Sequence, residues 1–357
     1  MYNAALQERR DAWAKQGVRV SKYDQQFELK DVRIERPDLA EVPVLALRGV
    51  LNRLDKAYQA FFRRCRTGKK PGYPRFKSAT RWDTLQFDQV TTKLIVAGDK
   101  RIAIPNLGKV RINLHRSLGG RPRAYSITLC GDGKWRVSIA CDEVPTKPLP
   151  ATGAEVGVDL GLTSFAATSD GEIFENPRPL REGRTALERA ERRVSRRIKG
   201  SRRRRKAVAL LRKRHARVAN VRREHHIRVA KSLVARYDVI YVEALNIKGL
   251  ARSRLAKSVN DAAWGGFGHW LGVKAEEAAR LVIEVNPAGT SQECSGCGTI
   301  VPKELSVRIH RCPHCGLTID RDVNAGINIK RFGSSLRRGT PVVVGSQRPE
   351  KRVLYAT

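Results

Sequence analysis

Four cysteines in the last quarter of the chain constrain the local fold more than any other feature of this sequence. They form two Cys-x2-Cys pairs, Cys294 with Cys297 and Cys312 with Cys315, with fourteen residues between the pairs. Four thiolates at this spacing can surround one Zn²⁺ as a tetrahedron, and a site with four protein ligands is closed and structural. A glycine follows each pair, where the chain has to turn tightly. We therefore expect a small zinc-binding module with one structural zinc ion.

The other three cysteines, Cys65, Cys130 and Cys141, are scattered and do not extend this pattern. One metal site among free thiols is typical of a reducing compartment, whereas a disulfide framework is typical of short secreted chains. We find no apolar run of membrane-spanning length, no signal peptide and no lipidation motif. We expect a cytoplasmic, nucleoid-associated protein that has no membrane partner.

The charge balance predicts a polyanionic partner. The 357 residues include 70 Lys and Arg against 35 Asp and Glu, which gives a net charge of +35. Solubility alone would mix the two signs and would not need this excess. A nucleic acid is the simplest partner for such a chain, and we expect no small-molecule substrate.

Two predicted strands carry a carboxylate near their end. Asp159 lies in the apolar stretch 154–162, which leads through the turn at Asp170-Gly171 into a predicted three-stranded meander. Glu243 ends the apolar stretch 237–243. A buried carboxylate is unfavourable unless it is paired or holds a metal ion. Each acid taken alone can be an ordinary strand-end residue. Only their position relative to one another in the fold can distinguish a shared metal site from two unrelated strand ends.

The predicted elements after residue 150 are three meander strands, a helix, a strand, a helix, a strand and a final helix. This order is the ribonuclease-H-like layout, an α/β fold in which the first strand is central and the fourth lies beside it. Asp159 and Glu243 would then be neighbours, and Asp322 would join them from the start of the last helix. Three such acids can hold two Mg²⁺ or Mn²⁺ ions for phosphodiester cleavage. Asp320 is an alternative ligand, or it caps the helix, or it is simply an exposed acid.

The first half of the chain changes its hydrophobic period near residue 80. We expect helices over residues 1–17 and 44–66, followed by a small antiparallel sheet or barrel and a proline-rich linker at 145–150. The predicted strands cover residues 85–87, 93–97, 101–104, 109–114, 124–130 and 135–142.

Two basic segments are candidates for nucleic-acid contact. The irregular stretch 66–77 mixes cations and aromatic residues with glycines and prolines. A solvated basic loop explains this composition about as well as nucleic-acid contact does. The long helical stretch 181–236, bent near Gly200, has such an excess of one sign that nucleic acid is favoured over a solvated hairpin. The candidate residues are Lys69, Lys70, Tyr73, Arg75 and Lys77 in the first segment and Arg202, Arg203, Arg204, Arg205 and Lys206 in the second.

Four segments together resemble the motifs of the OrfB/TnpB family of insertion-sequence proteins, which are related to the type V CRISPR effectors. These segments are residues 156–161, 241–246, 290–297 and 320–325. The resemblance implies an RNA-guided DNA endonuclease of a transposable element, with Asp159, Glu243 and Asp322 as the catalytic acids of a RuvC nuclease domain. It also implies a guide RNA and a target double-stranded DNA as partners, with base pairing reading the target sequence.

The same resemblance implies a division of the chain into domains. Residues 1–80 would form a helical recognition lobe, 81–147 a β wedge domain, 151–290 a RuvC-like core with the basic hairpin 181–236, 291–317 a zinc ribbon, 318–332 the last core helix and 333–357 a tail. Family members usually begin with one more strand, so we expect an N-terminally truncated lobe and a wedge sheet without that edge strand. Gly326 stands where alanine is usual and is expected to weaken the last helix slightly.

Three functions compete on these grounds. The three acids favour an RNA-guided endonuclease that uses two divalent cations. The missing N-terminal strand favours a non-cleaving nucleic-acid-binding regulator or transposition accessory protein on the same scaffold. A cut-and-paste transposase ranks last, because no helix-turn-helix domain is evident near the N-terminus.

Overall fold

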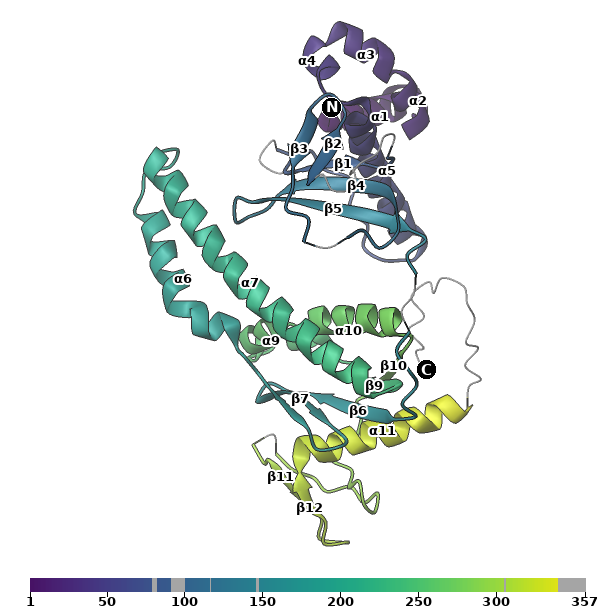
Figure 1. Cartoon of the computed structure of the whole chain (residues 1–357), viewed down its shortest axis with the longest axis vertical. Coiled ribbons are helices and arrows are strands. Elements are labelled where there is room, and N and C mark those ends of the chain that lie inside the picture. Colours follow the sequence, from purple (N-terminus) through teal and green to yellow (C-terminus); the bar gives the residue numbers. More distant parts are fainter. Residues whose placement is uncertain (79–81, 91–99, 116, 146–147, 305, 340–357) are drawn as a thin grey trace. The chain divides into compact units, whose positions relative to one another are not determined.

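The computed structural model describes residues 1–78, 82–90, 100–115, 117–145, 148–304 and 306–339. The chain divides into two compact units after Pro145. Figure 1 shows the helices and strands of each unit. Among the described helices, none combines the length and the apolar character that a membrane crossing requires.

The first unit begins with helices that pack around α5. These are α1 (Tyr2–Gln16), α2 (Lys22–Phe27), α3 (Leu29–Glu35), α4 (Pro37–Ala40) and α5 (Val44–Arg66). The two helices predicted from the sequence are present as α1 and α5, and α2 to α4 fill the segment that the sequence left unassigned. Ser21 starts α2 through a capping box with Asp24. Leu6, Leu51 and Leu54 are fully buried in the core between these helices.

Antiparallel strands complete the first unit. They are β1 (Thr84–Phe87), β2 (Arg101–Ile104), β3 (Gly108–Arg111), β4 (Arg121–Leu129) and β5 (Trp135–Asp142). One sheet has the order β1-β4-β5, and β2 pairs with β3 as a separate hairpin. The predicted strand at 93–97 lies outside the described residues. Ala46 of α5 packs on the stacked rings of Phe87 and Tyr125, whose centroids are 4.4 Å apart, so the helices and the sheet share a core.

The second unit is built on a five-stranded sheet with the order β10-β9-β6-β7-β8. Its strands are β6 (Glu155–Leu160), β7 (Ser164–Thr168), β8 (Ile173–Glu175), β9 (Val239–Glu243) and β10 (Leu281–Val285). β6, β7 and β8 form an antiparallel meander, while β9 is parallel to β6 and β10 is parallel to β9. The sequence predicts this order: the first strand is central and the fourth lies beside it.

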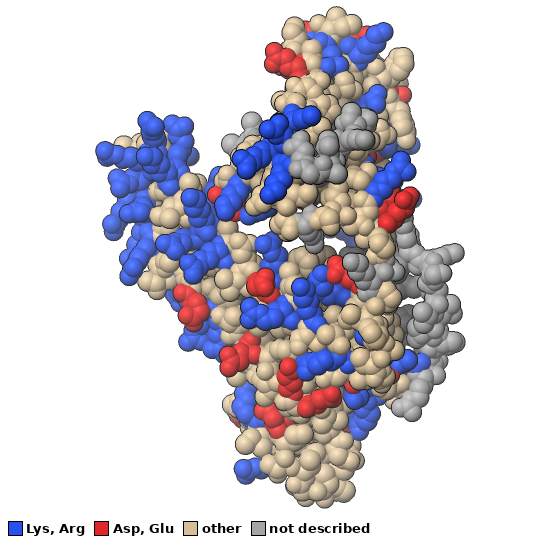
Figure 2. Space-filling model, viewed as in Figure 1, with Lys and Arg blue, Asp and Glu red and all other residues tan. Residues whose placement is uncertain are grey.

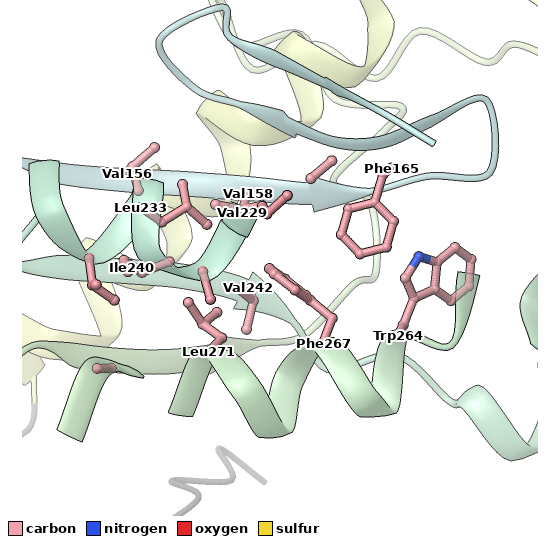
Figure 3. Packing of buried hydrophobic residues seen from close by; sticks show 14 of the residues in the cluster. Val156, Val158, Phe165, Val229, Leu233, Ile240, Val242, Trp264, Phe267 and Leu271 are labelled. Carbon is pink, nitrogen blue, oxygen red and sulfur yellow. The ribbon is translucent and has the colours of Figure 1, made fainter. Parts of the chain in front are cut away.

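Helices cover both faces of this sheet. The helices of this unit are α6 (Pro179–Ser195), α7 (Arg202–Arg236), α8 (Ile247–Leu250), α9 (Ala256–Ala262), α10 (Trp264–Ala278) and α11 (Arg321–Gly339). Of these, α7 and α10 pack on one face of the sheet and α11 packs on the other. Val158 of β6 and Val242 of β9 point toward Leu233 of α7 and Phe267 of α10 (Figure 3). Tyr241 lies on the opposite face with Ile329 of α11. This alternation follows from the two-residue repeat of a strand.

A small cysteine module lies between β10 and α11 in the sequence. Its hairpin consists of β11 (Ile309–Arg311) and β12 (Thr318–Asp320), and α11 follows directly. This cysteine module comprises residues 290–320.

Candidate functional site

The strand register places two of the predicted acids side by side. Val158 of β6 is paired with Val242 of the neighbouring parallel strand β9, and both side chains are buried on the α7 and α10 face. Because successive strand residues point to opposite faces, the next residues, Asp159 and Glu243, lie on the face that α11 covers. The sequence predicted this adjacency from the strand order alone.

Helix α11 adds the third acid. Asp322 lies in its first turn, and Asp322 Oδ2 is 3.8 Å from the position that a Cβ atom on Gly161 would take, two residues beyond Asp159. Asp320 has a different role, because its Oδ1 accepts hydrogen bonds from the backbone N–H groups of Asp322 at 2.8 Å and Val323 at 3.2 Å. Of the two acids that the sequence offers here, Asp320 caps the helix and Asp322 lies beside β6.

The three carboxylates act on one another electrostatically. Burial raises the pKa of Asp159 well above its usual value, and the negative charges of Glu243 and Asp322 raise it further. Burial also raises the pKa of Glu243, and a hydrogen bond from Thr290 opposes that rise. Burial raises the pKa of Asp322 as well. A divalent cation would relieve the repulsion within such a group of partly desolvated acids.

Two neighbours of these acids escaped the sequence analysis. Thr290 Oγ1 donates a hydrogen bond of 2.6 Å to Glu243 Oε1, and an Arg308 Nη1 atom lies 3.8 Å from Asp322 Oδ1. Thr290 belongs to the segment 290–297 that carries part of the family resemblance, but its spacing gives no hint of a contact with Glu243. No sequence signal singles out Arg308.

The donor atoms fit hard divalent cations. Carboxylate oxygens are the ligands that Mg²⁺ and Mn²⁺ prefer. Among the described residues, only the four cysteines bring three or more possible ligand atoms within 4.8 Å of one another. The carboxylate oxygens of the three acids are therefore spaced more widely than the cysteine sulfurs. Two cations about 3.5 to 4 Å apart bind ligands on the outer side of each ion. The carboxylates of such a site can therefore lie further apart than the ligands of a single ion. The fit therefore rests on the chemistry, the burial and the shared face of the acids.

The four cysteines converge with the geometry of a metal site. The Sγ atoms of Cys294 and Cys315 are 3.6 Å apart, and so are those of Cys297 and Cys312. A disulfide would hold two sulfurs at about 2 Å. A tetrahedron of Zn–S bonds of about 2.3 Å has edges of about 3.8 Å, which is close to the observed spacing. These thiols therefore fit one four-coordinate Zn²⁺.

The backbone around the two cysteine pairs repeats the same turn. The Gly298 N–H donates to the Cys294 carbonyl at 2.9 Å, and the Gly316 N–H donates to the Cys312 carbonyl at 3.0 Å. The φ angles of the two glycines are 78° and 77°, in the left-handed region. Glycine enters this region without steric strain, so the structure confirms the tight turns that the sequence predicted.

The first basic segment is irregular, as predicted, and it carries exposed aromatic rings. Tyr73 packs edge-on against Tyr58 and Phe61 but remains 45% exposed. The Arg10 guanidinium lies 5.5 Å from the centre of the exposed Phe76 ring. Exposed rings among cations suit unpaired bases and their phosphates. The exposed cations of this segment include Lys69, Lys70 and Arg75.

Lys77 has a more structural position than the other candidates. Its backbone N–H and carbonyl pair with the Asn3 side chain, each at 2.9 Å. Its Nζ atom lies 4.7 Å from the Tyr2 ring centre and 5.2 Å from that of Trp82, and burial lowers the pKa of the amine. Lys77 therefore fastens the loop to α1, and its charge is less available to a phosphate.

The second basic segment forms a hairpin of α6 and α7, with the break near Gly200 that the sequence predicted. Arg204 differs from its neighbours, because its Nη1 atom donates to the carbonyl oxygens of Val194 at 2.8 Å and Arg197 at 3.0 Å. It thereby satisfies carbonyl groups at and just beyond the C-terminus of α6 and holds the hairpin closed. The remaining candidates, Arg202, Arg203, Arg205 and Lys206, are exposed.

A pocket of about 590 Å³ lies between α6 and α7 and is lined mainly by arginines. Figure 2 shows Lys and Arg gathered over this hairpin. A salt bridge within the hairpin, Arg184 with Glu188 at 2.6 Å, lies outside the pocket lining. The sequence could not identify these residues, because it does not show which faces of the two helices meet. The lining arginines are Arg189, Arg192, Arg193, Arg196, Arg197 and Arg214.

The central sheet, the three acids under α11 and the cysteine module define a mixed α/β protein with ribonuclease-H-like strand order. Two family models match it: OrfB_IS605, described as "Probable transposase", over residues 138–254, and "Cas12f1-like, TNB domain" over residues 264–329. A protein of Streptomyces pristinaespiralis named "Putative RNA-guided DNA endonuclease" is 32% identical over 341 residues, which cover 93% of this chain and 83% of that relative. The chain belongs to the OrfB/TnpB family.

Two further comparisons agree with this assignment. The Escherichia coli (strain K12) protein named "Putative RNA-guided DNA endonuclease InsQ" is 29% identical over 315 residues, which cover 84% of this chain and 76% of that relative. Among solved structures, the "Cryo-EM structure of the Cas12f1-sgRNA-target DNA complex" matches with a TM-score of 0.55 and 14% identity. That match covers 92% of this chain and 79% of that one, and it is a likeness of fold.

Proposed function

We propose that this chain is an RNA-guided, divalent-metal-dependent DNA endonuclease of a transposable element. The observation that carries the proposal is the position of Asp159, Glu243 and Asp322 on one face of the sheet, where burial and mutual repulsion raise the pKa of Asp159. The names of the two relatives, which refer to RNA-guided DNA cleavage, supply the substrate class.

The three acids would hold two Mg²⁺ or Mn²⁺ ions in a RuvC-like site. Cations bound there would activate a water molecule and stabilise the leaving 3′ oxygen of a phosphodiester. The paired strands β6 and β9 keep Asp159 and Glu243 adjacent, and the first turn of α11 holds Asp322. Thr290 restrains the carboxylate of Glu243 through its 2.6 Å hydrogen bond. The rigid elements thus position the acids before any substrate binds.

The four cysteines would hold one structural Zn²⁺. All four ligand positions are taken by protein thiols, so this site leaves no place for a substrate or a water molecule. The contribution of the metal there would be the folding free energy of the cysteine module.

A guide RNA and a target double-stranded DNA would occupy the basic surfaces. The arginine-lined pocket of the α6–α7 hairpin and the loop around Tyr73 support phosphate and base contacts without reading sequence. Base pairing between guide and target would supply the sequence specificity. We place this activity in the cytoplasm, at the nucleoid where the DNA lies.

Plasmid cleavage tests the proposal. The full-length chain is purified with RNA transcribed from the end of its element and incubated with Mg²⁺ and a target plasmid whose flanking bases are randomised. We expect cleavage, and we expect Asp159→Ala, Glu243→Ala and Asp322→Ala each to lower its rate roughly 1,000-fold, because each removes several kcal/mol of transition-state stabilisation. Glu175→Ala removes an exposed acid of the same sheet and should cleave normally.

Three results would overturn the proposal. Tight RNA binding without cleavage would support the non-cleaving regulator instead. Joined rather than cut DNA ends would support a cut-and-paste transposase. Undiminished cleavage by Asp159→Ala would place the active site elsewhere.

A further inference from the structure

A buried hydrogen bond connects the cysteine module to the carboxylates. Thr290 is only 1% exposed, and its Oγ1 lies 2.6 Å from Glu243 Oε1 and 3.0 Å from the Pro287 carbonyl oxygen. A hydroxyl group has one hydrogen and can donate to only one of these acceptors at a time. An ionised carboxylate is the stronger acceptor, so the hydrogen goes to Glu243 whenever that side chain is charged.

The segment that carries Thr290 is fastened to α11 by two asparagines, both fully buried. Asn328 Nδ2 donates to the carbonyl oxygens of Thr290 at 2.9 Å and Glu293 at 2.7 Å. Asn324 Nδ2 donates to the Glu293 carbonyl at 2.8 Å, and its Oδ1 accepts from the Ser295 N–H at 2.9 Å. Helix α11 therefore fixes the entrance to the cysteine module and also carries the third acid.

We propose that Thr290, held by Asn328, is a positioning residue for Glu243 and couples the fold of the cysteine module to divalent-cation binding by the acids. This inference deepens the proposed function and rests on cations binding there. Glu243 ends β9, and its flexible side chain would sample several rotamers without a partner. Removal of a hydrogen-bond partner of a metal-ligating side chain typically lowers metal affinity or activity 10- to 100-fold.

A purely structural role for Thr290 makes a different prediction. If its hydroxyl only closes the turn with Pro287, its loss should lower the melting temperature in buffer free of Mg²⁺ and Mn²⁺ and leave cation affinity unchanged. If it positions Glu243, its loss should lower cation affinity while the melting temperature without Mg²⁺ and Mn²⁺ changes little. The two readouts therefore separate the two roles.

Mn²⁺ binding to the full-length protein, measured by calorimetry with the zinc content monitored, provides the test. Thr290→Val keeps the shape of the side chain and should weaken Mn²⁺ binding about 10-fold or more. Thr290→Ser keeps the hydroxyl and should bind Mn²⁺ within about twofold of the wild type, by the same reasoning. Thr318→Val, at an exposed threonine in β12, is the matched control and should bind Mn²⁺ normally.

A double-mutant cycle tests the coupling to the module. Cys312→Ser alone should weaken Mn²⁺ binding, because an unfolded module no longer holds Thr290. The same substitution in the Thr290→Val background should weaken it much less, because the connection is already broken. Equal effects in both backgrounds would overturn the coupling.

The outcomes also separate this inference from the proposed function. Wild-type Mn²⁺ affinity in Thr290→Val, or an equal loss in Thr290→Ser, overturns the positioning role. If Asp159→Ala binds Mn²⁺ like the wild type, the proposed function fails instead. Loss of binding in Asp159→Ala with normal binding in Thr290→Val leaves the function in place and removes only this inference.

Discussion

Gly326 of α11 lies directly against Gly157 of β6, with no side chain between the two backbones. A Cβ atom on Gly157 would overlap the Gly326 carbonyl oxygen, and a Cβ atom on Gly326 would lie 2.9 Å from the Ser169 backbone nitrogen. The expectation that Gly326 weakens the last helix considers only helix propensity. The structure shows why glycine stands here: a Cβ atom at this position has no room beside β6 and β7. The close approach of α11 to β6 in turn places Asp322 near Asp159.

Gly326→Ala should therefore destabilise the protein although alanine is the better helix former. The added methyl group would push α11 away from β6 and β7, and overpacking of this kind costs about 1–3 kcal/mol. Urea denaturation measures the free energy of unfolding. Gly272→Ala in α10, where a Cβ atom meets nothing within 4 Å, is the control and should stabilise the helix. A gain in stability from Gly326→Ala would contradict the packing argument.

Asp159→Asn should stabilise the cation-free protein. Burial, together with Glu243 and Asp322, raises the pKa of Asp159 in the folded chain, so folding favours its protonated form. The contribution of this carboxyl group to the free energy of unfolding is fully present below its pKa in the unfolded chain, about 3.9. It is lost as the pH rises through the higher pKa of the folded chain. We expect a gain of about 1–2 kcal/mol at pH 8 in buffer free of Mg²⁺ and Mn²⁺, measured by thermal melting.

Mg²⁺ should reverse that order. The wild type gains stability from a bound cation, and Asp159→Asn should gain much less. Glu175→Gln, at an exposed acid in β8, should show neither effect. A lower melting temperature of Asp159→Asn in buffer free of Mg²⁺ and Mn²⁺ would contradict the repulsion between the acids.

His225→Leu should make the protein less sensitive to acid. The His225 ring packs edge-on against Phe165 with 4.7 Å between centroids, and burial lowers its pKa to about 4. Because the folded pKa is below the unfolded value of about 6.5, the stability from neutral His225 is present above pH 6.5 and is lost as the pH falls toward 4.

Denaturation at a series of pH values checks this. The wild type should lose up to about 3 kcal/mol through His225 between pH 6.5 and 4, and His225→Leu should not show this loss. His269→Leu, at an exposed position in α10, should follow the wild-type profile. Identical profiles for all three proteins would remove His225 as a source of acid sensitivity.

The purified chain should contain one zinc ion, which elemental analysis can measure. Cys312→Ser should lose this zinc, whereas Cys65→Ser, at an exposed thiol outside the module, should keep it. In zinc-finger peptides the binding free energy of about 10–16 kcal/mol is also folding free energy, so we expect amide hydrogen exchange over residues 290–320 to become faster in Cys312→Ser. Unchanged exchange in a zinc-free variant would mean that the module folds without metal.

The pocket between α6 and α7 should contact RNA phosphates. Arg193→Gln with Arg214→Gln should weaken binding of the element-derived RNA and reduce the slope of log affinity against log salt by about 1.5, because two phosphate contacts are lost. Arg184→Gln, at an ion-paired residue outside the pocket, should leave the slope unchanged. Arg204→Gln should instead lower the stability of the hairpin. An unchanged slope in the double variant would exclude the pocket from RNA binding.

Several parts of this fold could be predicted from local patterns alone. The helical spacing of apolar residues predicts α5 at its observed bounds, Val44–Arg66, and the alternation at Trp135–Asp142 does the same for β5. The strand order of the second unit follows from the order of its elements, since a meander pairs antiparallel and helical crossovers give parallel strands. Short polar helices such as α2 were missed, because they have too few residues to show a period.

Contacts between distant segments could not be read in this way. Arg202 and Arg204 belong to one run of arginines in the sequence, but only the folded hairpin shows that Arg204 binds the carbonyl groups at the end of α6. Lys77 and Lys70 look alike in their loop, yet Lys77 lies over the rings of Tyr2 and Trp82. The partners of Arg204 lie across the turn of the hairpin, and Tyr2 is far from Lys77 along the chain.

The sequence by itself determined the chemistry available to this protein: four thiols at metal-binding spacing, acids near the ends of two strands and at the start of a helix, and a large excess of cations. Only the tertiary structure decided that Asp322 lies beside β6 and that Thr290 binds Glu243. The physical reason is that periodicity and spacing are local properties of a chain, whereas the partner of a buried polar group is set by which elements pack against each other.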